Sequence, residues 1–207
     1  MTEPPGLRER KKAETRRALS DAALHLAFER GLDNVTRDDI AERAGVSLRT
    51  FNNYFAGKYD ALAYRQLERM RLSINAFRDR PAGEPLWTAI TETVLEPLVA
   101  EGAEGKAPTA AQLAEVRKLS TAVELRTALY KELSTEWVEA IAERTGTDPA
   151  RDMYPRLVAG VIRAVGEAAT DAYLTADPPV PVVGLLRRAF ADVAAGLPEP
   201  TARSCKE

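Results

Sequence analysis

The sequence predicts an all-α protein of about nine helices, in which a small N-terminal helix-turn-helix domain of three helices precedes a larger C-terminal helical domain. Apolar residues recur at spacings of three and four along most of the chain, which is the period of an amphipathic helix. Sustained alternation of β-branched residues, the pattern of a half-buried strand, is not found. Clusters of glycine and proline separate the helical stretches.

The N-terminal part predicts four helices at short intervals. The first covers residues 7–30, and Gly31 follows its last apolar position, where a left-handed backbone commonly ends a helix. Thr36 begins a short helix that ends near residue 44, and Ser47 begins a second that ends near residue 53. A longer helix then runs from residue 58 to about residue 78.

The stretch 80–85, rich in proline and glycine, marks the clearest boundary in the chain. Beyond it we expect four helical stretches: 84–101, 109–146 with a break near residue 120, 149–175 and 182–196. The expected division is therefore an N-terminal domain over 1–57, a connecting helix over 58–83, a C-terminal domain over 84–197 and a flexible tail over 198–207.

Composition excludes several classes of protein. The chain of 207 residues has no apolar run long enough to cross a bilayer and no apolar N-terminal signal, so we expect a cytoplasmic protein without a membrane partner. Its single cysteine, Cys205, and single histidine, His25, lie far apart in the sequence. They leave little for a zinc site or a Cys–His nucleophile, and we expect no metal and no cofactor.

Charge is distributed unevenly along the chain. The net charge is −2 at pH 7, but residues 1–58 carry eleven basic and nine acidic side chains. A weakly basic front and an acidic remainder are typical of a protein that places one end on a polyanion. A solvated helix start would give the same pattern, so charge alone does not decide between the two.

Residues 36–55 carry the most specific local pattern. They predict a helix, a tight turn and a second helix, with a buried seam of five side chains: Ile40, Ala44, Val46, Phe51 and Phe55. Gly45 lies where the turn needs a left-handed backbone. Two helices joined this tightly cross at a steep angle, so the second can enter the major groove of DNA.

The outward side chains of the second helix are suited to DNA. Hydrogen-bond donors and apolar contacts for base edges come from four of them: Leu48, Arg49, Asn52 and Asn53. Donors for phosphate oxygens come from a flanking set: Thr36, Arg37, Ser47, Thr50, Tyr54 and Lys58. One such helix reads only a few base pairs, so we expect two copies on an inverted repeat of double-stranded DNA.

Small, aromatic and polar residues recur around this segment over roughly residues 10–65: Ala22–Ala23, Phe28, Gly31, Val35–Thr36, Ile40–Ala41, Ala44–Ser47, Thr50–Phe51, Tyr54–Phe55 and Lys58. Together they resemble the DNA-binding domain of the TetR family of bacterial repressors. The resemblance implies that the helix from Ser47 reads the groove, while Thr36, Tyr54 and Lys58 hold the DNA backbone. Asn52 departs from the pattern, because that position is most often aromatic in the family.

The same resemblance implies a repressor, located on the bacterial nucleoid, that a small apolar effector releases from a palindromic operator. Eight residues are candidates for the effector pocket: Trp87, Leu98, Leu113, Val116, Arg126, Leu133, Trp137 and Val161. Residues 123–129 and 142–146 are similar to a TetR subgroup whose C-terminal domain is described as acyl-CoA-like ligand binding. In that case Arg117, Lys118 or Arg126 would meet phosphates. Ordinary core packing and solvated helix charge are the simpler interpretation of all these residues.

The resemblance also implies a homodimer formed by the last two helices. One helix offers a seam of small residues at a spacing of four: Gly160, Ala164, Ala168 and Ala172. The other offers larger apolar residues: Val183, Leu186, Phe190 and Val193. Alternatively, both faces pack inside one monomer.

The sequence carries none of the common enzyme motifs. The sequence has no Gly-rich phosphate loop, no His-Glu-x-x-His and no Gly-x-Ser-x-Gly motif, so we expect no enzyme. The alternatives left are a DNA-binding protein with a different effector or with none, and a lipid-carrying helical bundle that does not touch DNA.

Overall fold

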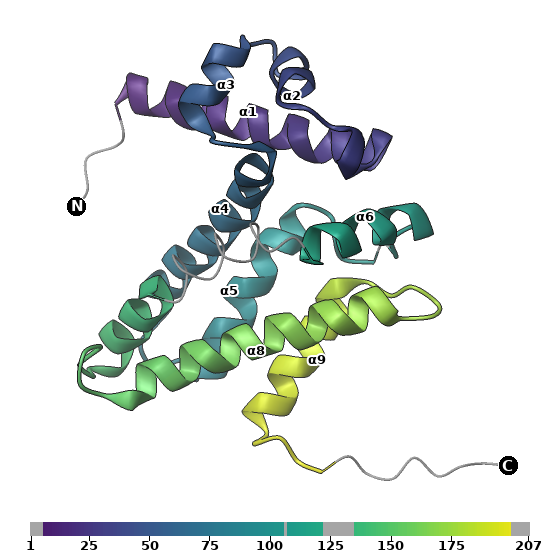
Figure 1. Cartoon of the computed structure of the whole chain (residues 1–207). Helices are drawn as coiled ribbons and strands as arrows, with labels where there is room; N and C mark the ends of the chain where they lie inside the picture. The colour runs from purple at the N-terminus through teal and green to yellow at the C-terminus, as the bar shows by residue number, and fades with distance from the viewer. Residues whose placement is uncertain (1–5, 106, 122–134, 200–207) are drawn as a thin grey trace, which may run out of the picture.

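The computed structural model describes residues 6–105, 107–121 and 135–199, and every regular element in these ranges is a helix (Figure 1). In chain order these are α1 (Leu7–Arg30), the short 3-10 helix η1 (Leu32–Asn34), α2 (Arg37–Arg43), α3 (Leu48–Tyr54), α4 (Lys58–Asp79), α5 (Leu86–Ala100), α6 (Ala110–Thr121), α8 (Met153–Thr175) and α9 (Val182–Ala194). Residues 135–145 are also helical. The predicted all-α class is confirmed.

The N-terminal helices enclose a core of their own, and we call α1–α3 with the start of α4 the head. Its largest fully buried side chains are Leu19 and Leu26 of α1, Ile40 of α2 and Phe51 of α3. The apolar face predicted for α1 is confirmed, because Leu19, Ala22, Ala23, Leu26 and Ala27 are all buried. The helices of the head are therefore held by burial of apolar surface on their facing sides.

A second core lies at the other end of the molecule, between α4, α5, the helix at 135–145, α8 and α9. Helix α4 belongs to both cores: Ala61 and Leu62 near its start lie in the head, and Ile74 and Phe77 near its end lie in the second core. One continuous helix therefore joins the head to the C-terminal region, as Figure 1 shows.

Helix α8 begins later than the sequence predicts. The prediction placed its start at residue 149, whereas the helix begins at Met153. The carboxylate of Asp148 accepts the N–H of Ala150 at 2.8 Å, and the carboxylate of Asp152 accepts the N–H of Asp148 at 2.7 Å. These side-chain contacts form a turn that competes with helix over the four preceding residues.

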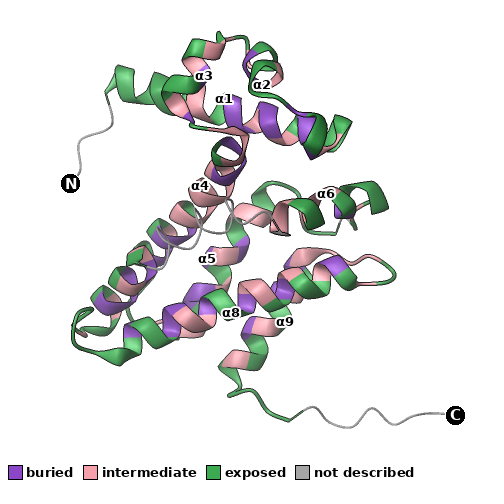
Figure 2. Ribbon diagram, in the orientation of Figure 1, coloured by how far each residue is buried: buried purple, intermediate pink, exposed green. Residues whose placement is uncertain are grey.

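The first half of α1 differs from the rest of the head. Every buried residue of this helix lies at Leu19 or beyond, and residues 7–14 are exposed (Figure 2). Among the helices described, none combines the length and the apolar character needed to span a bilayer.

Candidate nucleic-acid interface

Helices α2 and α3 begin with side-chain caps. Each has only seven residues, a length at which an isolated helix is unstable in water. Thr36 Oγ1 accepts the N–H of Asp39 at 3.2 Å, and Asp39 Oδ2 accepts the N–H of Thr36 at 2.9 Å, which forms a capping box. Ser47 Oγ accepts the N–H of Thr50 at 3.1 Å. The caps fix where both helices start.

The turn between the two helices has the predicted geometry. Gly45 has a φ of +69°, which confirms the left-handed backbone predicted there. The N–H of Val46 then donates to the carbonyl of Ala41 at 2.9 Å. In the predicted seam, Ile40, Phe51 and Phe55 are buried, whereas Ala44 and Val46 are half-buried. The seam therefore holds α3 in one orientation against α2 and α1.

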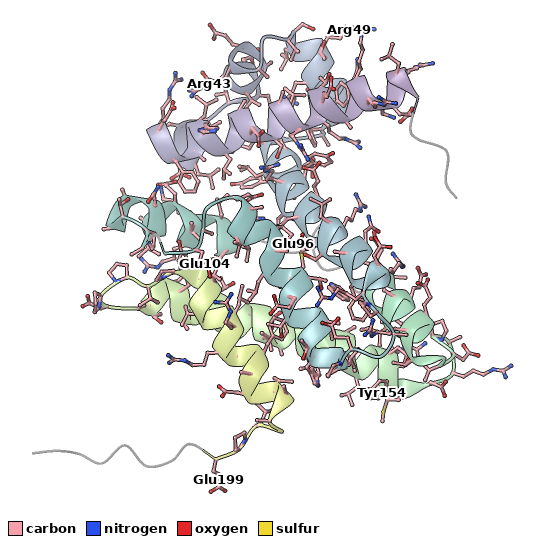
Figure 3. All side chains as sticks on the ribbon, turned by 180° about the vertical axis from the view of Figure 1, so that it is seen from behind. Arg43, Arg49, Glu96, Glu104, Tyr154 and Glu199 are labelled. Carbon is pink, nitrogen blue, oxygen red and sulfur yellow. The ribbon has the colours of Figure 1, made fainter. Side chains whose placement is uncertain are left out.

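The outward face of α3 carries three exposed polar side chains: Arg49, Asn52 and Asn53. Arg49 projects from the outer end of the head, away from the C-terminal region (Figure 3). The side-chain Oδ1 of Asn52 accepts a hydrogen bond from Arg37 Nη1 of α2 at 3.4 Å. This contact, which sequence analysis did not predict, joins two of the predicted DNA-binding residues to each other. Leu48 and Thr50 are half-buried on the same helix.

The predicted phosphate donors differ in whether their hydroxyl protons are already used in hydrogen bonds within the protein. The hydroxyl of Thr36 donates to Asp39 Oδ2 at 2.5 Å, so its proton is already engaged within the capping box. The hydroxyls of Ser47 and Thr50 lie 2.9 Å apart and share one hydrogen bond. Tyr54 is half-buried at the end of α3.

Lys58 is turned back toward the protein. Its ammonium donates to the carbonyl oxygens of Leu32 at 2.9 Å and Val35 at 3.1 Å. These carbonyls belong to the segment that enters α2, so Lys58 positions the start of the helix-turn-helix. An ammonium has three N–H groups, and two are used here. The predicted phosphate contact of Lys58 would therefore use its third N–H group.

Helix α6 reaches the head at the same segment, which sequence analysis missed. Glu115 Oε2 accepts the N–H of Leu32 at 2.8 Å, and Lys118 Nζ lies 3.0 Å from Asp33 Oδ2 and 3.2 Å from Glu115 Oε1. The carboxylates of Asp33 and Glu115 raise the pKa of Lys118. Leu32 is therefore bonded through its carbonyl to α4 and through its N–H to α6. No local sequence pattern pairs residues this far apart.

Arginines make a second connection between the head and the C-terminal region. Arg65 of α4 lies 3.3 Å from Asp21 of α1 and 3.4 Å from Glu101 at the end of α5. Arg69 of α4 pairs with the same Glu101 at 2.6 Å. These ion pairs link α1, α4 and α5 near the middle of the molecule.

The candidate effector residues divide between the second core and α6. Trp137 is buried, with its ring centroid 5.4 Å from that of Phe77. The other described candidates are half-buried against the same core or lie on α6: Trp87, Leu98, Val161, Leu113 and Val116. Arg126 and Leu133 lie outside the described residues.

Two cations weighed for an effector's phosphates bind protein groups instead. Arg117 Nη2 donates to the carbonyl of Leu174 at 2.7 Å, and Lys118 pairs with Asp33 and Glu115. Both side chains therefore hold α6 to its neighbours.

The candidate dimer residues also divide into two sets. Ala164, Ala168 and Ala172 are exposed along α8, and Gly160 is half-buried. Three residues of α9 that were predicted to contact a second copy are buried in the core of the single chain: Val183, Leu186 and Phe190. Within one chain the alternative expectation, that this face packs inside the monomer, describes these three, because α9 turns an apolar face toward its own core. Val193 is half-buried at the edge of that core.

Known proteins match both ends of the chain. The family described as bacterial regulatory proteins, tetR family, matches residues 19–63, and the MftR C-terminal domain matches residues 84–198. The HTH-type transcriptional regulator TcmR of Streptomyces glaucescens is 31% identical over 179 residues, which are 84% of this chain and 79% of that protein.

Solved structures share the fold. A TetR-family transcriptional regulator from Syntrophomonas wolfei has a TM-score of 0.62 at 15% identity, over 92% of this chain and 100% of that chain. Thermus thermophilus FadR, in complex with lauroyl-CoA, has a TM-score of 0.58 at 19% identity, over 91% of this chain and 98% of that one.

The head geometry and these matches define a helix-turn-helix transcriptional regulator and not an enzyme. The chain belongs to the TetR family of bacterial regulatory proteins. The family assignment agrees with the resemblance drawn from the sequence.

Proposed function

We propose that the protein is a ligand-responsive repressor of the bacterial cytoplasm that binds an inverted-repeat operator as a homodimer through α3. One observation carries the proposal: α3 presents Arg49, Asn52 and Asn53 to solvent, on a helix whose start is capped and whose opposite side is buried. Such side chains pair with base edges in the major groove. A face that is ordered before binding loses less conformational entropy on binding than a mobile one.

Replacing Arg49 tests this directly. The Arg49→Ala variant leaves the cap and the seam intact, so affinity for an operator selected from random DNA is expected to fall by about 1–3 kcal/mol. Affinity for random-sequence DNA changes little. The control is Arg78→Ala, which removes the same charge from the far end of α4. Fluorescence anisotropy measures both. If wild-type protein prefers no sequence, the proposal fails; if Arg49→Ala retains operator affinity, the role of this residue fails.

The homodimer is assigned to the outward face of α8. At its start Tyr154 is 46% and Leu157 55% exposed, and the small residues Ala164, Ala168 and Ala172 continue the exposed side. Small side chains let two helices approach closely. Ala168→Arg is expected to give a monomer in light scattering, whereas Ala111→Arg on exposed α6 leaves the mass unchanged. A dimeric Ala168→Arg variant would contradict this placement.

The effector is proposed to be apolar, such as an acyl-CoA. Half-buried Trp87, Leu98 and Val161 border the second core, and Thermus thermophilus FadR, a protein of the same fold, is in complex with lauroyl-CoA. A ligand at about 100 times its Kd stabilises the folded state by roughly 2.7 kcal/mol. Lauroyl-CoA is therefore expected to raise the melting temperature, and CoA alone is not. If acyl-CoA of no acyl-chain length raises the melting temperature, the alternative holds, in which the protein has a different effector or none.

The division predicted from the sequence completes the proposal: a DNA-binding domain over residues 1–57, a connecting helix over 58–83 and an effector and dimer region over 84–197. Effector binding would change the separation of the two heads, so that they no longer fit successive major grooves. Helix α4 is one structural connection through which effector binding would move the head, and the contact of Glu115 with Leu32 is a second.

A further inference from the structure

The first half of α1 is a helical segment without a role in the core. Residues 7–18 contain none of the buried residues of this helix, and at about 1.5 Å per residue the segment is roughly 18 Å long. The matched DNA-binding family domain begins only at residue 19. Figure 2 shows this part of α1 almost wholly exposed. Any function of this segment therefore depends on its exposed side chains.

That surface is strongly basic. Residues 7–18 contain six basic and two acidic side chains, whereas the whole chain has a net charge of −2. Two of the six contact residues outside α1: Arg16 lies over the rings of Phe55 and Tyr64 at 5.9 and 5.5 Å, and Arg17 pairs with Glu68 at 2.8 Å.

Three other cations, Arg8, Lys11 and Lys12, lie three and four residues apart and so share one side of α1, which we call the α1 basic face. Cations near a helix N-terminus oppose the helix dipole, and a bound polyanion would offset that cost.

The α1 basic face borders the end of α3. Arg8, Lys11, Lys12 and Thr15 line one side of an open groove of about 820 Å³, and Asn53 and Tyr54 line the other. Glu9 is an acidic member of the lining. The groove thus begins where the outward face of α3 ends. The two DNA strands that border a major groove run on both sides of a protein helix seated in it. A duplex bound to α3 therefore brings one phosphate backbone toward the protein groove between α1 and α3.

We infer that the α1 basic face binds the phosphate backbone of the duplex, beside the major groove that α3 enters. The inference rests on the proposed function and adds a second DNA contact outside the helix-turn-helix. Continuity with α3 favours DNA over an acidic protein as the occupant. These contacts neutralise phosphates and release counterions, so they strengthen binding to any sequence and make it more sensitive to salt.

The test is the double variant Lys11→Ala/Lys12→Ala. Alanine is the best helix former, so α1 keeps its helix and circular dichroism is unchanged. The slope of log K against log salt is expected to become shallower by about 0.9 for each lysine that contacts a phosphate. Operator and random DNA lose affinity by the same factor, so their ratio is unchanged. Lys11→Arg/Lys12→Arg retains the wild-type slope.

A matched control removes two charges elsewhere. Arg78→Ala/Arg151→Ala lowers the net charge equally at the end of the molecule remote from the head, and wild-type binding is expected. A wild-type slope in the lysine variant, an equal loss in the control, or a loss confined to the operator would each overturn the inference. A wild-type protein that prefers no sequence would instead defeat the proposed function.

Discussion

The head and the C-terminal region are stabilised in different ways. In the head, the seven-residue helices α2 and α3 start at the side-chain caps of Thr36 and Ser47. In the C-terminal region, α5 and α9 start after Pro85 and Pro181 without a side-chain cap, and buried faces hold them. The helix starts of the helix-turn-helix are therefore specified by residues close in sequence, and the C-terminal region depends on contacts between distant ones. This difference explains why a DNA site can be located from twenty consecutive residues and an effector site cannot.

A matched pair of core substitutions tests whether the two regions are separate. Phe51 and Phe190 are buried to within 1% in the head and the second core, and each change to alanine is expected to cost about 3–5 kcal/mol. Trp87 and Trp137 both belong to the second core, so tryptophan fluorescence reports that region alone. Phe51→Ala should lower the midpoint of a far-UV circular dichroism transition, abolish DNA binding and leave the fluorescence midpoint unchanged.

Phe190→Ala serves as the reverse experiment, because it should shift the fluorescence midpoint in denaturant. If Phe51→Ala shifts both signals together, the two cores unfold as one unit, and the division into regions describes position only.

The contact of α6 with the head is the next largest effect. Glu115→Ala leaves the partly buried N–H of Leu32 without its carboxylate, at an expected cost to the head of about 1–3 kcal/mol. Glu115→Gln keeps an acceptor and should recover part of it. Glu104→Ala, which removes an exposed carboxylate paired with Arg187, is the control. If Glu115→Ala matches that control in circular dichroism melts, the contact contributes nothing to the stability of the head.

The caps are expected to matter less. Thr36→Ala and Ser47→Ala should each lower the stability of the head by about 1 kcal/mol. The loss should appear in the circular dichroism transition and not in tryptophan fluorescence. Thr175→Ala removes an exposed hydroxyl at the last residue of α8, which donates to the carbonyl of Asp171 at 2.8 Å but does not fix the start of a helix, and it should leave both transitions almost unchanged. An effect of Thr175→Ala as large as that of Thr36→Ala would blur the distinction between the two regions.

The smallest effect depends on pH. Hydrogen bonds from the hydroxyl and the backbone N–H of Thr36 hold the pKa of Asp39 below its ordinary value of 3.8. A carboxyl whose pKa is lower in the folded state contributes stability above that ordinary value and loses it as the pH falls through the folded pKa. The stability difference between wild type and Asp39→Asn should therefore shrink on acidification below pH 4. Urea melts at several pH values measure it, and a constant difference would contradict the prediction.

The sequence predicted the helix-turn-helix because its determinants are local. The left-handed Gly45, the buried Phe51 and the exposed Arg49 follow from spacing within a few residues. Lys58 shows where this reasoning stops: its residue type suits a phosphate, but the carbonyls that bind it are set by the path of the chain after α1.

The C-terminal region was harder to predict because an amphipathic pattern says which residues share a face and not what covers that face. The pattern placed Val183, Leu186 and Phe190 on one face, and only the family resemblance suggested a second copy as its partner; in the single chain the three residues pack in their own core. Likewise, Glu115 looks like an ordinary helix carboxylate until α6 is seen against η1.

Leu32 has its N–H bonded to one helix of the C-terminal region and its carbonyl to the helix that enters it. Its amide hydrogen thus reports, at a single atom, on the contact of the head with α6. Protection of that hydrogen against exchange with deuterium should change when an effector loosens or tightens α6, even where no helix changes length. A nuclear magnetic resonance spectrum of the ¹⁵N-leucine-labelled protein would follow that signal without any DNA present.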